Sequence, residues 1–387
     1  MKKRLGIYVH IPFCQRKCRY CYFLSSNMEK KVIDKYIEAL NIEIRTYSRE
    51  LKEYKVATIY IGGGTPSFVD SKYIKEILEN IRNNYDVEEK AEITIEVNPG
   101  TLLNEKIQDN KESGINRVSI GLQSTNNEEL ELLGRIHTYE EFEKNYNRLR
   151  KVGFDNINID IMSAIPNQTL ESYITTLNKV VSLQPEHISS YSLIIEEGTY
   201  FYNHQKELKL VTEDEEREMY YKTKEILQKH GYERYEISNY AKKGYESKHN
   251  SSYWTGVDYI GFGIGASSYV KGIRYDRIRN IDEYISYYED IENVENIKEK
   301  NKIECNIQVL TEKEKIEEYM FLGLRMIKGI SKTDFAKQFN RTVEEIYGNV
   351  LDKYVKLGML ENSQDRIRLT EKGLDVSNAI FADFLLD

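Results

Sequence analysis

The chain is short of cysteine, of long apolar runs and of excess positive charge, and each shortage excludes a class of protein. Four cysteines in 387 residues are too few for the disulfide framework of a small secreted domain. No apolar run approaches the ~20 residues of a membrane-spanning helix, so we expect no membrane span. The net charge of -8 argues against a protein that binds nucleic acid through bulk electrostatics.

The N-terminal segment MKKRLGIYVHIPFC places a basic end before an apolar run, as a secretory leader does. The run is too short for a leader, it carries His10, and no small-residue cleavage site follows it. We therefore expect this segment to be the first strand of a mature cytoplasmic protein. Hydrophobic residues make up 40% of the chain, which is enough for a sizeable packed core.

Short β-rich runs alternate with amphipathic helical patterns as far as residue 195. The expected strands are 6–13, 57–64, 91–99, 117–124, 156–166 and 187–195. The expected helices are 29–52, 71–84, 104–113, 139–152 and 169–183. Near-apolar strands followed by helices indicate right-handed βαβ units and a parallel sheet. We therefore predict an α/β fold with a partial (βα)6 TIM-type barrel, and a doubly wound sheet is the alternative. Both place their chemistry at the carboxyl ends of the strands.

The composition divides the chain into three parts. We assign residues 1–288 to the barrel with its C-terminal extension, the charged segment 289–310 to a linker, and residues 311–387 to a C-terminal domain. In the last part, helical runs precede a possible two-strand wing, MLENSQDRIRLT, and a final helix, which is the order of a winged-helix-like α+β domain. Acidic residues slightly outnumber basic ones there, so we expect a structural or protein-docking module rather than a DNA reader.

Three of the four cysteines lie together in CQRKCRYCYF, at Cys14, Cys18 and Cys21, directly after the first expected strand. A tetrahedral zinc site takes four ligands, and His10 would have to supply the fourth. A [4Fe-4S] cluster held by three cysteines instead leaves one iron open to a small ligand. An amine and a carboxylate can chelate that iron, and S-adenosylmethionine has both. The C-x3-C-x2-C spacing favours the cluster.

The cysteine motif is one of a series that runs through nearly the whole chain. The others are IGGGTPS, IEVNPGT, RVSIGLQS, LGRIH, NIDIMSAIPNQT, PEHISSYSL, YERYEISNYA and HNSSYW. With these motifs the chain resembles the radical S-adenosylmethionine (SAM) proteins, and more narrowly the oxygen-independent coproporphyrinogen III oxidase family. It is most similar to the heme chaperone branch of that family. The resemblance implies a radical SAM barrel, a [4Fe-4S] cluster, S-adenosylmethionine and heme. We expect as partners a heme-acceptor protein and a low-potential electron donor such as flavodoxin or ferredoxin.

The resemblance also implies a set of residues that contact S-adenosylmethionine. Carboxylates and amides suit its amine and ribose hydroxyls, and a guanidinium suits its carboxylate. The alternatives are a plain tight turn for GGGTP, a core aromatic for Tyr8 and a surface ion pair for Arg135. Asp160 lies in an otherwise apolar strand, where a charge needs a partner. The expected contacts are Tyr8, Gly63, Gly64, Thr65, Glu96, Gln123, Arg135 and Asp160.

Two later motifs carry further expectations. HNSSYW brings His249 close to Tyr253 and to the only Trp of the chain, and a His beside aromatics can ligate or stack on a porphyrin iron. The resemblance implies that His249 binds heme. A hydrogen-bonded His beside two packing aromatics is the alternative.

GFGIGASS, residues 261–268, does not follow the first strand of a βαβ unit, so we interpret it as close backbone packing near the barrel mouth rather than a dinucleotide loop.

One position separates the heme chaperone branch from the enzyme branch. The oxidases have a fourth cysteine two residues after the third, where this chain has Phe23, and they have a longer N-terminal extension. Both differences favour a heme chaperone. The alternatives are coproporphyrinogen III oxidation, which is a radical SAM oxidative decarboxylation, and another radical SAM reaction. Whether the chain is an enzyme stays open.

Overall fold

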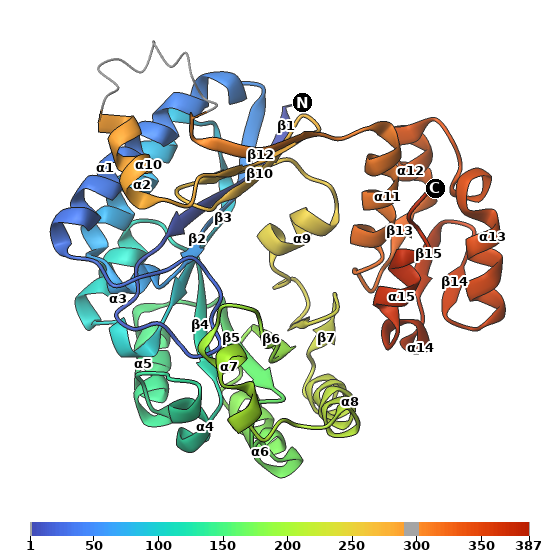
Figure 1. Cartoon of the computed structure of the whole chain (residues 1–387), viewed down its shortest axis with the longest axis horizontal. Coiled ribbons are helices and arrows are strands. Elements are labelled where there is room, and N and C mark those ends of the chain that lie inside the picture. The colour runs from blue at the N-terminus through green and yellow to red at the C-terminus, as the bar shows by residue number, and fades with distance from the viewer. Residues whose placement is uncertain (1, 290–301, 387) are drawn as a thin grey trace.

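Six parallel strands form the centre of the structure. The computed structural model describes residues 2–289 and 302–386 (Figure 1). Each strand pairs in parallel with the next one along the chain. Helices cover their outer face. The strands are β1 (Lys3–Ile11), β2 (Tyr54–Gly63), β3 (Val87–Val97), β4 (Arg117–Gln123), β5 (Ile157–Ser163) and β6 (His187–Ser192). The helices between them are α1 (Lys30–Tyr47), α2 (Ser71–Asn84), α3 (Asn104–Glu112), α4 (Asn127–Leu132), α5 (Tyr139–Val152) and α6 (Leu170–Ser182).

The strand order confirms the predicted partial barrel and excludes the doubly wound alternative. The central strands follow one another in chain order from β1 to β6 without a reversal, whereas a doubly wound sheet reverses its order at a switch point. In the described residues β1 and β6 are not neighbours, so the barrel is open. The predicted strands and helices up to residue 195 each correspond to an element, and α4 is an additional short helix.

The C-terminal extension lengthens the sheet at both edges. At one edge β9 pairs in parallel with β1, and three antiparallel strands follow it. At the other edge β8 pairs antiparallel with β6 and with β7. The strands are β7 (Glu233–Arg234), β8 (Asn239–Ala241), β9 (Tyr259–Phe262), β10 (Ser267–Val270), β11 (Ile273–Arg277) and β12 (Glu304–Val309). The helices are α7 (Tyr200–Asn203), α8 (Glu213–Lys229), α9 (Lys248–Trp254) and α10 (Ile281–Glu289).

The C-terminal end of the predicted linker, residues 289–310, is a β-strand in the structure. Residues 290–301 lie outside the described residues, but Glu304–Val309 form β12, which pairs with β11. The segment looked like a linker because β12 is an edge strand, whose side chains are mostly exposed and need not be apolar. The backbone pairing, rather than a buried face, places this segment in the sheet.

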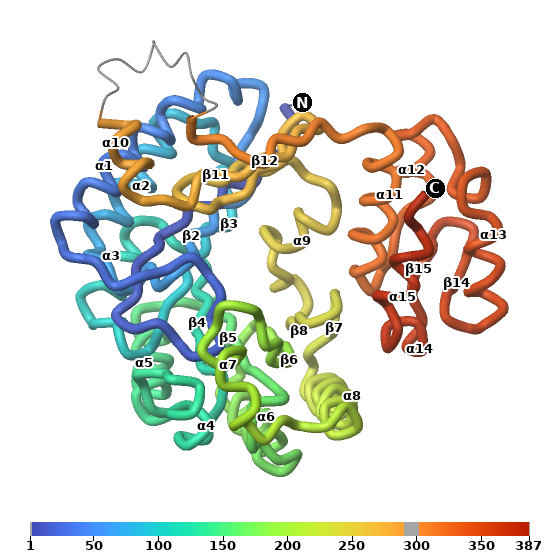
Figure 2. The backbone as a smooth tube through the Cα atoms, in the orientation of Figure 1, coloured from blue at the N-terminus to red at the C-terminus, as the bar shows by residue number. Residues whose placement is uncertain are grey.

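The C-terminal part has a hydrophobic cluster of its own. Its elements follow one another in the order of a winged helix (Figures 1 and 2). The wing predicted from MLENSQDRIRLT is present as the antiparallel pair β14 and β15. The last predicted helix is two short helices. The elements are α11 (Glu312–Gly323), β13 (Ile330–Ser331), α12 (Lys332–Phe339), α13 (Val343–Lys356), β14 (Leu360–Asn362), β15 (Arg366–Leu369), α14 (Glu371–Leu374) and α15 (Ser377–Ala382). The exact domain boundaries stay a prediction.

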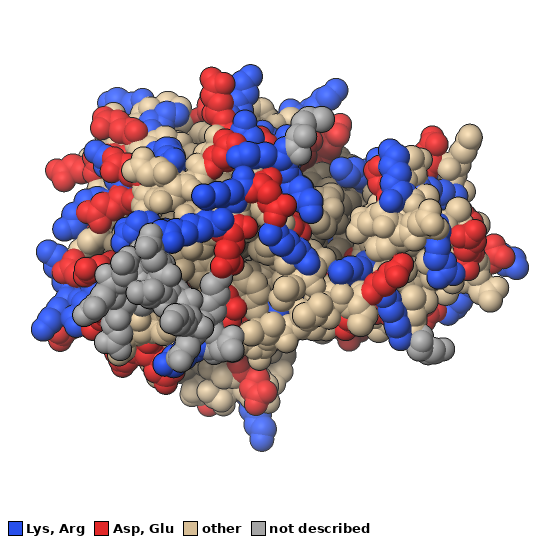
Figure 3. Space-filling model, turned by 90° about the horizontal axis from the view of Figure 1, so that it is seen from above, with Lys and Arg blue, Asp and Glu red and all other residues tan. Residues whose placement is uncertain are grey.

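The surface carries both signs of charge. On the face seen in Figure 3, Lys and Arg side chains are interspersed with Asp and Glu over the barrel and the C-terminal part. Within the described ranges, no helix combines the length and the apolar character that crossing a bilayer requires.

Candidate functional site

The cysteine loop, which we define as residues 12–26, leaves β1 and returns to its own base. The amide of Cys14 donates to the carbonyl of Ser26, and the amide of Ser26 donates to the carbonyl of Pro12, each at 3.0 Å. Higher in the loop, the amide of Cys21 donates to the carbonyl of Cys18 at 3.2 Å. The loop is therefore closed by backbone hydrogen bonds before any ligand binds its thiols.

The glycine motif after β2 lies directly against the base of this loop. The amide of Gly64 donates to the carbonyl of Ile11 at 2.9 Å, and that of Thr65 donates to the carbonyl of Phe13 at 2.8 Å. A Cβ on Gly64 would come within 2.8 Å of the same Phe13 oxygen and 3.0 Å of the Cys14 sulfur. Gly63 has a φ of +111°, which favours glycine. The glycines thus permit a close backbone approach, and the neighbour that approaches is the cysteine loop.

His10 does not supply a fourth metal ligand. Its Nε2 lies 2.9 Å from the carbonyl oxygen of Leu24 and must donate to it, so its Nδ1 accepts from the hydroxyl of Tyr8, also at 2.9 Å. Burial lowers the pKa of His10 and keeps the ring neutral. With both ring nitrogens engaged, His10 is not available as the fourth ligand that the zinc alternative requires.

The three cysteine thiols open onto one cavity, which we call the cofactor cavity. Its volume is about 150 Å³. The structure brings together here every residue that the sequence predicted for the cluster and for S-adenosylmethionine, except Tyr8. The predicted residues in its wall are Cys14, Cys18, Cys21, Gly63, Gly64, Thr65, Glu96, Gln123, Arg135 and Asp160. Tyr8 lies outside this wall and contacts His10 and the ring of Tyr60.

The thiols are suited to a cationic iron cluster. Burial raises the pKa of Cys14, and it raises the pKa of Cys21 to about 11. Such thiols are protonated near neutral pH unless a metal stabilises the thiolate. Cys14 Sγ lies 3.3 Å from the hydroxyl of Thr65, and the Arg135 guanidinium lies 3.6 Å from Cys18 Sγ. The residues present therefore fit a cluster held by three cysteines, with polar groups around its sulfurs.

Two carboxylates face this cavity from neighbouring parts of the barrel. Glu96, near the end of β3, accepts from the hydroxyl of Tyr60 at 2.7 Å and from the amide of Gly63 at 3.1 Å. Burial raises the pKa of Glu96 to about 7; the bond from Tyr60 opposes this effect and the nearby Asp160 adds to it. Asp160 accepts from Asn158 at 2.7 Å and from Ser119 at 3.1 Å, and burial raises its pKa too. The pair can receive cationic or hydroxyl groups of a ligand.

Gln123 and Arg135 complete the wall. Gln123 has a φ of +70° at the end of β4, an uncommon conformation for a residue other than glycine that is typical of functional sites. Its amide oxygen accepts from the hydroxyl of Tyr191 at 3.2 Å. The Arg135 guanidinium donates to the carbonyl of Gly121 at 2.7 Å, and its Nε has no hydrogen-bond partner in the described part of the chain. Arg135 is therefore not a surface ion pair, and it has a donor to offer.

A second cavity adjoins the first, and we call it the inner chamber. Its volume is about 450 Å³, and it shares Tyr20, Cys21, Glu96 and Asp160 with the cofactor cavity, among other residues. The sequence prediction missed most of its polar wall. The available signal was a polar side chain in an otherwise apolar strand, as in RVSIGLQ and NINID. The missed polar residues are Arg117, Ser119, Asn158, Ser189, Ser192, Glu196, Ser238, Asn239 and Asn250.

His249 is buried and already has partners. It lies in the first turn of α9, where Nδ1 contacts the hydroxyl of Thr58 and Nε2 contacts that of Tyr253, each at 2.8 Å. Its ring stacks on Tyr60 with centroids 5.0 Å apart. Burial, with the charge of Arg117, lowers the pKa of His249 to about 3. In this conformation His249 has the environment of a packed, hydrogen-bonded histidine, and it lies outside the walls of both cavities.

The turn after β9, residues 263–266, packs against the cysteine loop and the end of β1. A Cβ on Gly265 would lie 2.9 Å from the Leu24 side chain, and one on Gly263 would lie 2.8 Å from the carbonyl oxygen of His10. The hydroxyl of Tyr36 donates to that same oxygen at 2.8 Å and accepts from the amide of Ile264 at 3.2 Å. The prediction of close backbone packing for GFGIGASS is therefore confirmed.

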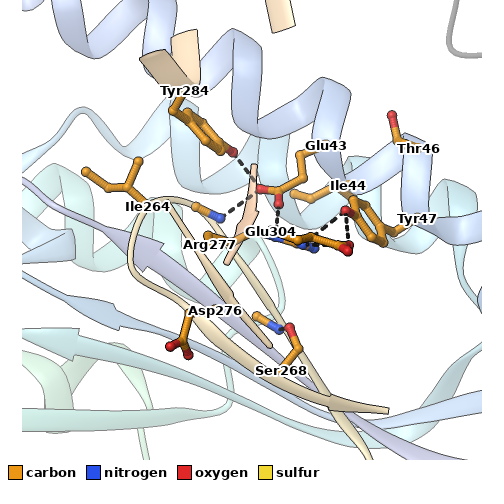
Figure 4. A network of polar contacts seen from close by, with 12 residues as sticks. Glu43, Ile44, Thr46, Tyr47, Ile264, Ser268, Asp276, Arg277, Tyr284 and Glu304 are labelled. Atoms are coloured by element: carbon orange, nitrogen blue, oxygen red, sulfur yellow. Dashed lines mark hydrogen bonds and ion pairs between the residues drawn. The ribbon is translucent and has the colours of Figure 1, made fainter. Parts of the chain in front are cut away.

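A buried network fixes this turn to α1 (Figure 4). The Glu43 carboxylate accepts from the amide of Gly263 at 2.8 Å and from the hydroxyl of Tyr284 at 2.5 Å. It also forms an ion pair with Arg277 at 2.5 Å, and both side chains are fully buried. Arg277 reaches Glu304 on β12 at 3.1 Å. Elements from both ends of the barrel sequence thus meet behind the cysteine loop.

Comparison with known proteins identifies the families that the chain resembles. The family model of the radical SAM superfamily matches residues 8–180, and that of the HemN C-terminal domain matches residues 310–376. Curated proteins named heme chaperone HemW are similar over their whole length: that of Lactococcus lactis is 39% identical over 100% of this chain and 99% of the relative. Those of Bacillus subtilis and Escherichia coli are 36% and 31% identical, over 98% and 99% of this chain and 98% of each relative.

A solved structure shares the whole fold. Coproporphyrinogen III oxidase (HemN) from Escherichia coli, a radical SAM enzyme, superposes with a TM-score of 0.84 over 99% of this chain and 90% of its own. The identity is 22%, so this likeness supports the fold, including the open barrel and the C-terminal domain. From the full-length identity to the curated relatives, the chain belongs to the HemW family of the radical SAM superfamily.

Proposed function

We propose that the chain is a heme chaperone, which binds heme and transfers it to an acceptor protein while it carries a [4Fe-4S] cluster and exchangeable S-adenosylmethionine. The observation that carries the proposal is the wall of the cofactor cavity. Three thiols open onto it, the fourth cysteine of the oxidases is absent, and the relatives that match the full chain are named heme chaperones. Phe23, which stands at the position of the missing cysteine, is 51% exposed and stacks on Tyr22 with centroids 4.7 Å apart.

We propose that different residues of the cavity contact different parts of the cofactor. Cys14, Cys18 and Cys21 would hold the cluster and leave one iron for S-adenosylmethionine. Together the two groups would supply one-electron cleavage of the sulfonium. The Glu96 carboxylate suits the amine, and the free Nε of Arg135 suits the carboxylate.

The remaining wall residues complete the pocket for the cofactor. Asp160 and Gln123 suit the ribose hydroxyls. Gly63, Gly64 and Thr65 also line the cavity and would contact the methionyl part. For Tyr8 we propose an indirect role, because its hydroxyl donates to Nδ1 of His10 and so supports the ring orientation in which Nε2 donates to the carbonyl of Leu24.

Heme ligation by His249 is the second part of the proposal. Nε2 of His249 has to leave the hydroxyl of Tyr253 before it can bind an iron. The low pKa helps, because a neutral imidazole is the form that ligates a metal. We therefore propose a binding step in which α9 rearranges. We propose that the chain functions in the cytoplasm, where thiols stay reduced and can hold a cluster. We also propose that a low-potential electron donor approaches the exposed Arg16 and Lys17 of the cysteine loop.

Cluster reconstitution tests the ligand assignment. Anaerobically reconstituted protein is expected to hold about one [4Fe-4S] cluster. Replacing Cys14, Cys18 or Cys21 by Ala is expected to abolish it, as measured by iron content and visible absorbance. Cys305→Ala is the matched control, because this thiol lies on β12 and contacts the carbonyl of Asp276. A cluster that survives in any of the three variants would remove that cysteine from the ligand set.

Two further assays separate chaperone from oxidase. Hemin added to the protein is expected to give a Soret band that weakens in His249→Ala and not in His230→Ala, which changes an exposed histidine. An unchanged spectrum in His249→Ala would assign the iron to another ligand. With reductant, S-adenosylmethionine and coproporphyrinogen III, no protoporphyrinogen IX is expected. Formation of that product would establish the oxidase in place of the chaperone.

A further inference from the structure

Arg117 is a buried cation for which residues 2–289 and 302–386 supply no counter-ion in contact. It begins β4, and its side chain is 1% exposed and contributes to the wall of the inner chamber. In the described part of the chain its Nε has no hydrogen-bond partner, and no carboxylate lies within ion-pair distance of the guanidinium. A buried charge without a partner is costly, and an anionic ligand bound beside it would offset that cost.

Three carboxylates line the chamber: Glu96 and Asp160 are engaged elsewhere, and Glu196 is half-buried and forms no ion pair with Arg117 in the described part of the chain. Glu96 accepts from Tyr60 and from the amide of Gly63, and Asp160 accepts from Ser119 and Asn158. They offset the charge of Arg117 only at longer range. The guanidinium keeps its planar, bidentate donor set for an anion, and a carboxylate is the anion that matches this geometry.

The rest of the chamber indicates what carries that carboxylate. The wall of the chamber contains amide and hydroxyl side chains besides Arg117, and it also contains apolar and aromatic side chains, of which Tyr22 and Phe23 belong to the cysteine loop. The volume of about 450 Å³ falls within the ordinary range of small-molecule sites. A ligand with a flat apolar body and a carboxylate arm would match both kinds of side chain. The apolar wall is formed by Tyr22, Phe23, Met162, Tyr191, Leu193 and Ile194.

We propose that the inner chamber receives a carboxylate arm of the tetrapyrrole and that Arg117 is its counter-ion. The inference rests on the proposed heme-binding function and adds to it a second point of attachment, distinct from an iron ligand. Tyr22, Phe23 and Ile194 are 56%, 51% and 68% exposed, so the apolar wall extends to the surface and leaves room for a macrocycle larger than the chamber. Arg117 then selects for a free carboxylate, and it does so whether or not the tetrapyrrole carries iron.

Metal-free protoporphyrin IX and its dimethyl ester test the proposal, because neither has an iron for His249 to bind. Binding to the full chain is followed by porphyrin fluorescence. The free acid is expected to bind the unmodified chain more tightly than the ester does. Arg117→Gln is expected to weaken binding of the free acid by about 10- to 100-fold, which is the range of one charge-assisted hydrogen-bonded pair, and to leave the ester unchanged. Arg117→Lys should retain part of the affinity, and Arg341→Gln, at an exposed arginine, should retain all of it.

Each alternative outcome overturns the inference in a recognisable way. If the ester and the free acid bind the unmodified chain equally, the chain does not recognise a carboxylate of the porphyrin. This comparison needs no variant. If Arg117→Gln fails to fold or melts well below the unmodified chain, the arginine is structural; removal of a buried charge that has no ion-pair partner is expected to leave Tm unchanged or to raise it. If hemin binds through His249 but protoporphyrin IX does not bind, the proposed function stands and this inference fails. If neither binds, both fail.

Discussion

Replacement of Glu96 by Gln isolates the electrostatics of the cofactor cavity. In the cofactor-free chain the pKa of Glu96 is about 7, against an ordinary value of 4.5, because burial outweighs the hydrogen bonds from Tyr60 and Gly63. The folded state therefore holds a proton between these two values where the unfolded state does not. It follows that the free energy of unfolding falls as pH rises from about 4.5 to about 7.

The size of this effect follows from the shift. At 1.36 kcal/mol per pH unit, the ionisation of Glu96 costs the folded chain up to about 3 kcal/mol by pH 8. Glu96→Gln removes this cost, so the variant is expected to gain stability relative to the unmodified chain as pH rises from 5 to 8. The measurement is urea unfolding of cofactor-free protein at several pH values. Glu89→Gln, at an exposed position of the same strand, is the control and should show no such gain.

The same carboxylate sets the pH dependence of cofactor binding. A carboxylate attracts the amine of S-adenosylmethionine and a carboxylic acid does not. The ionised fraction of a group with a pKa of about 7 rises about 10-fold from pH 6 to pH 8. Affinity for S-adenosylmethionine in reconstituted protein is expected to rise by about the same factor, and to be lower and flat in Glu96→Gln. Parallel pH profiles for the unmodified chain and the variant, in either stability or binding, would refute this account of Glu96.

Three further predictions concern the support of the cysteine loop. Gly64→Ala places a Cβ 2.8 Å from the carbonyl oxygen of Phe13, so we expect about 1–3 kcal/mol of destabilisation and low iron content on reconstitution; Gly348→Ala, which meets open space, should cause neither. Arg277→Met leaves a buried carboxylate without its cation and should cost about 3–5 kcal/mol in urea unfolding. A loss below 1 kcal/mol would contradict the role given to this ion pair. Tyr36→Phe should cost about 1–3 kcal/mol, because the His10 carbonyl loses a buried donor; an unchanged unfolding midpoint would count against that bond.

The barrel could be predicted from sequence because its elements are local patterns. The periods of strands and helices alternate through the first 195 residues, and the parallel sheet that they imply gathers the carboxyl ends of its strands. That rule alone brought Glu96, Gln123 and the cysteine loop together, without a view of the structure. β12 was missed because an edge strand has little apolar signal.

The inner chamber could not be predicted in the same way. Arg117 lies at the amino end of β4, away from the edge that the rule selects, and only its charge in an apolar strand marks it. The position of Tyr8 behind the cavity wall depends on which face of β1 it shares with His10. Tyr253 lies in the same motif as His249, but its other partners, Thr58 and Tyr60, lie nearly 200 positions earlier in the chain. No local pattern encodes such contacts.

The support of the cysteine loop by the turn after β9 has a consequence for the order of events during synthesis. The loop emerges from the ribosome first, but the residues against which Leu24 and the His10 carbonyl rest are 263–265, more than two hundred positions later. A nascent chain that ends within the barrel therefore has the three thiols but lacks residues 263–265, which support the cysteine loop. We expect iron to enter the protein after translation is nearly finished, and pulse-labelled chains that gain iron before residue 265 is made would contradict this. Assembly of the metal centre would then report that the whole barrel has been made.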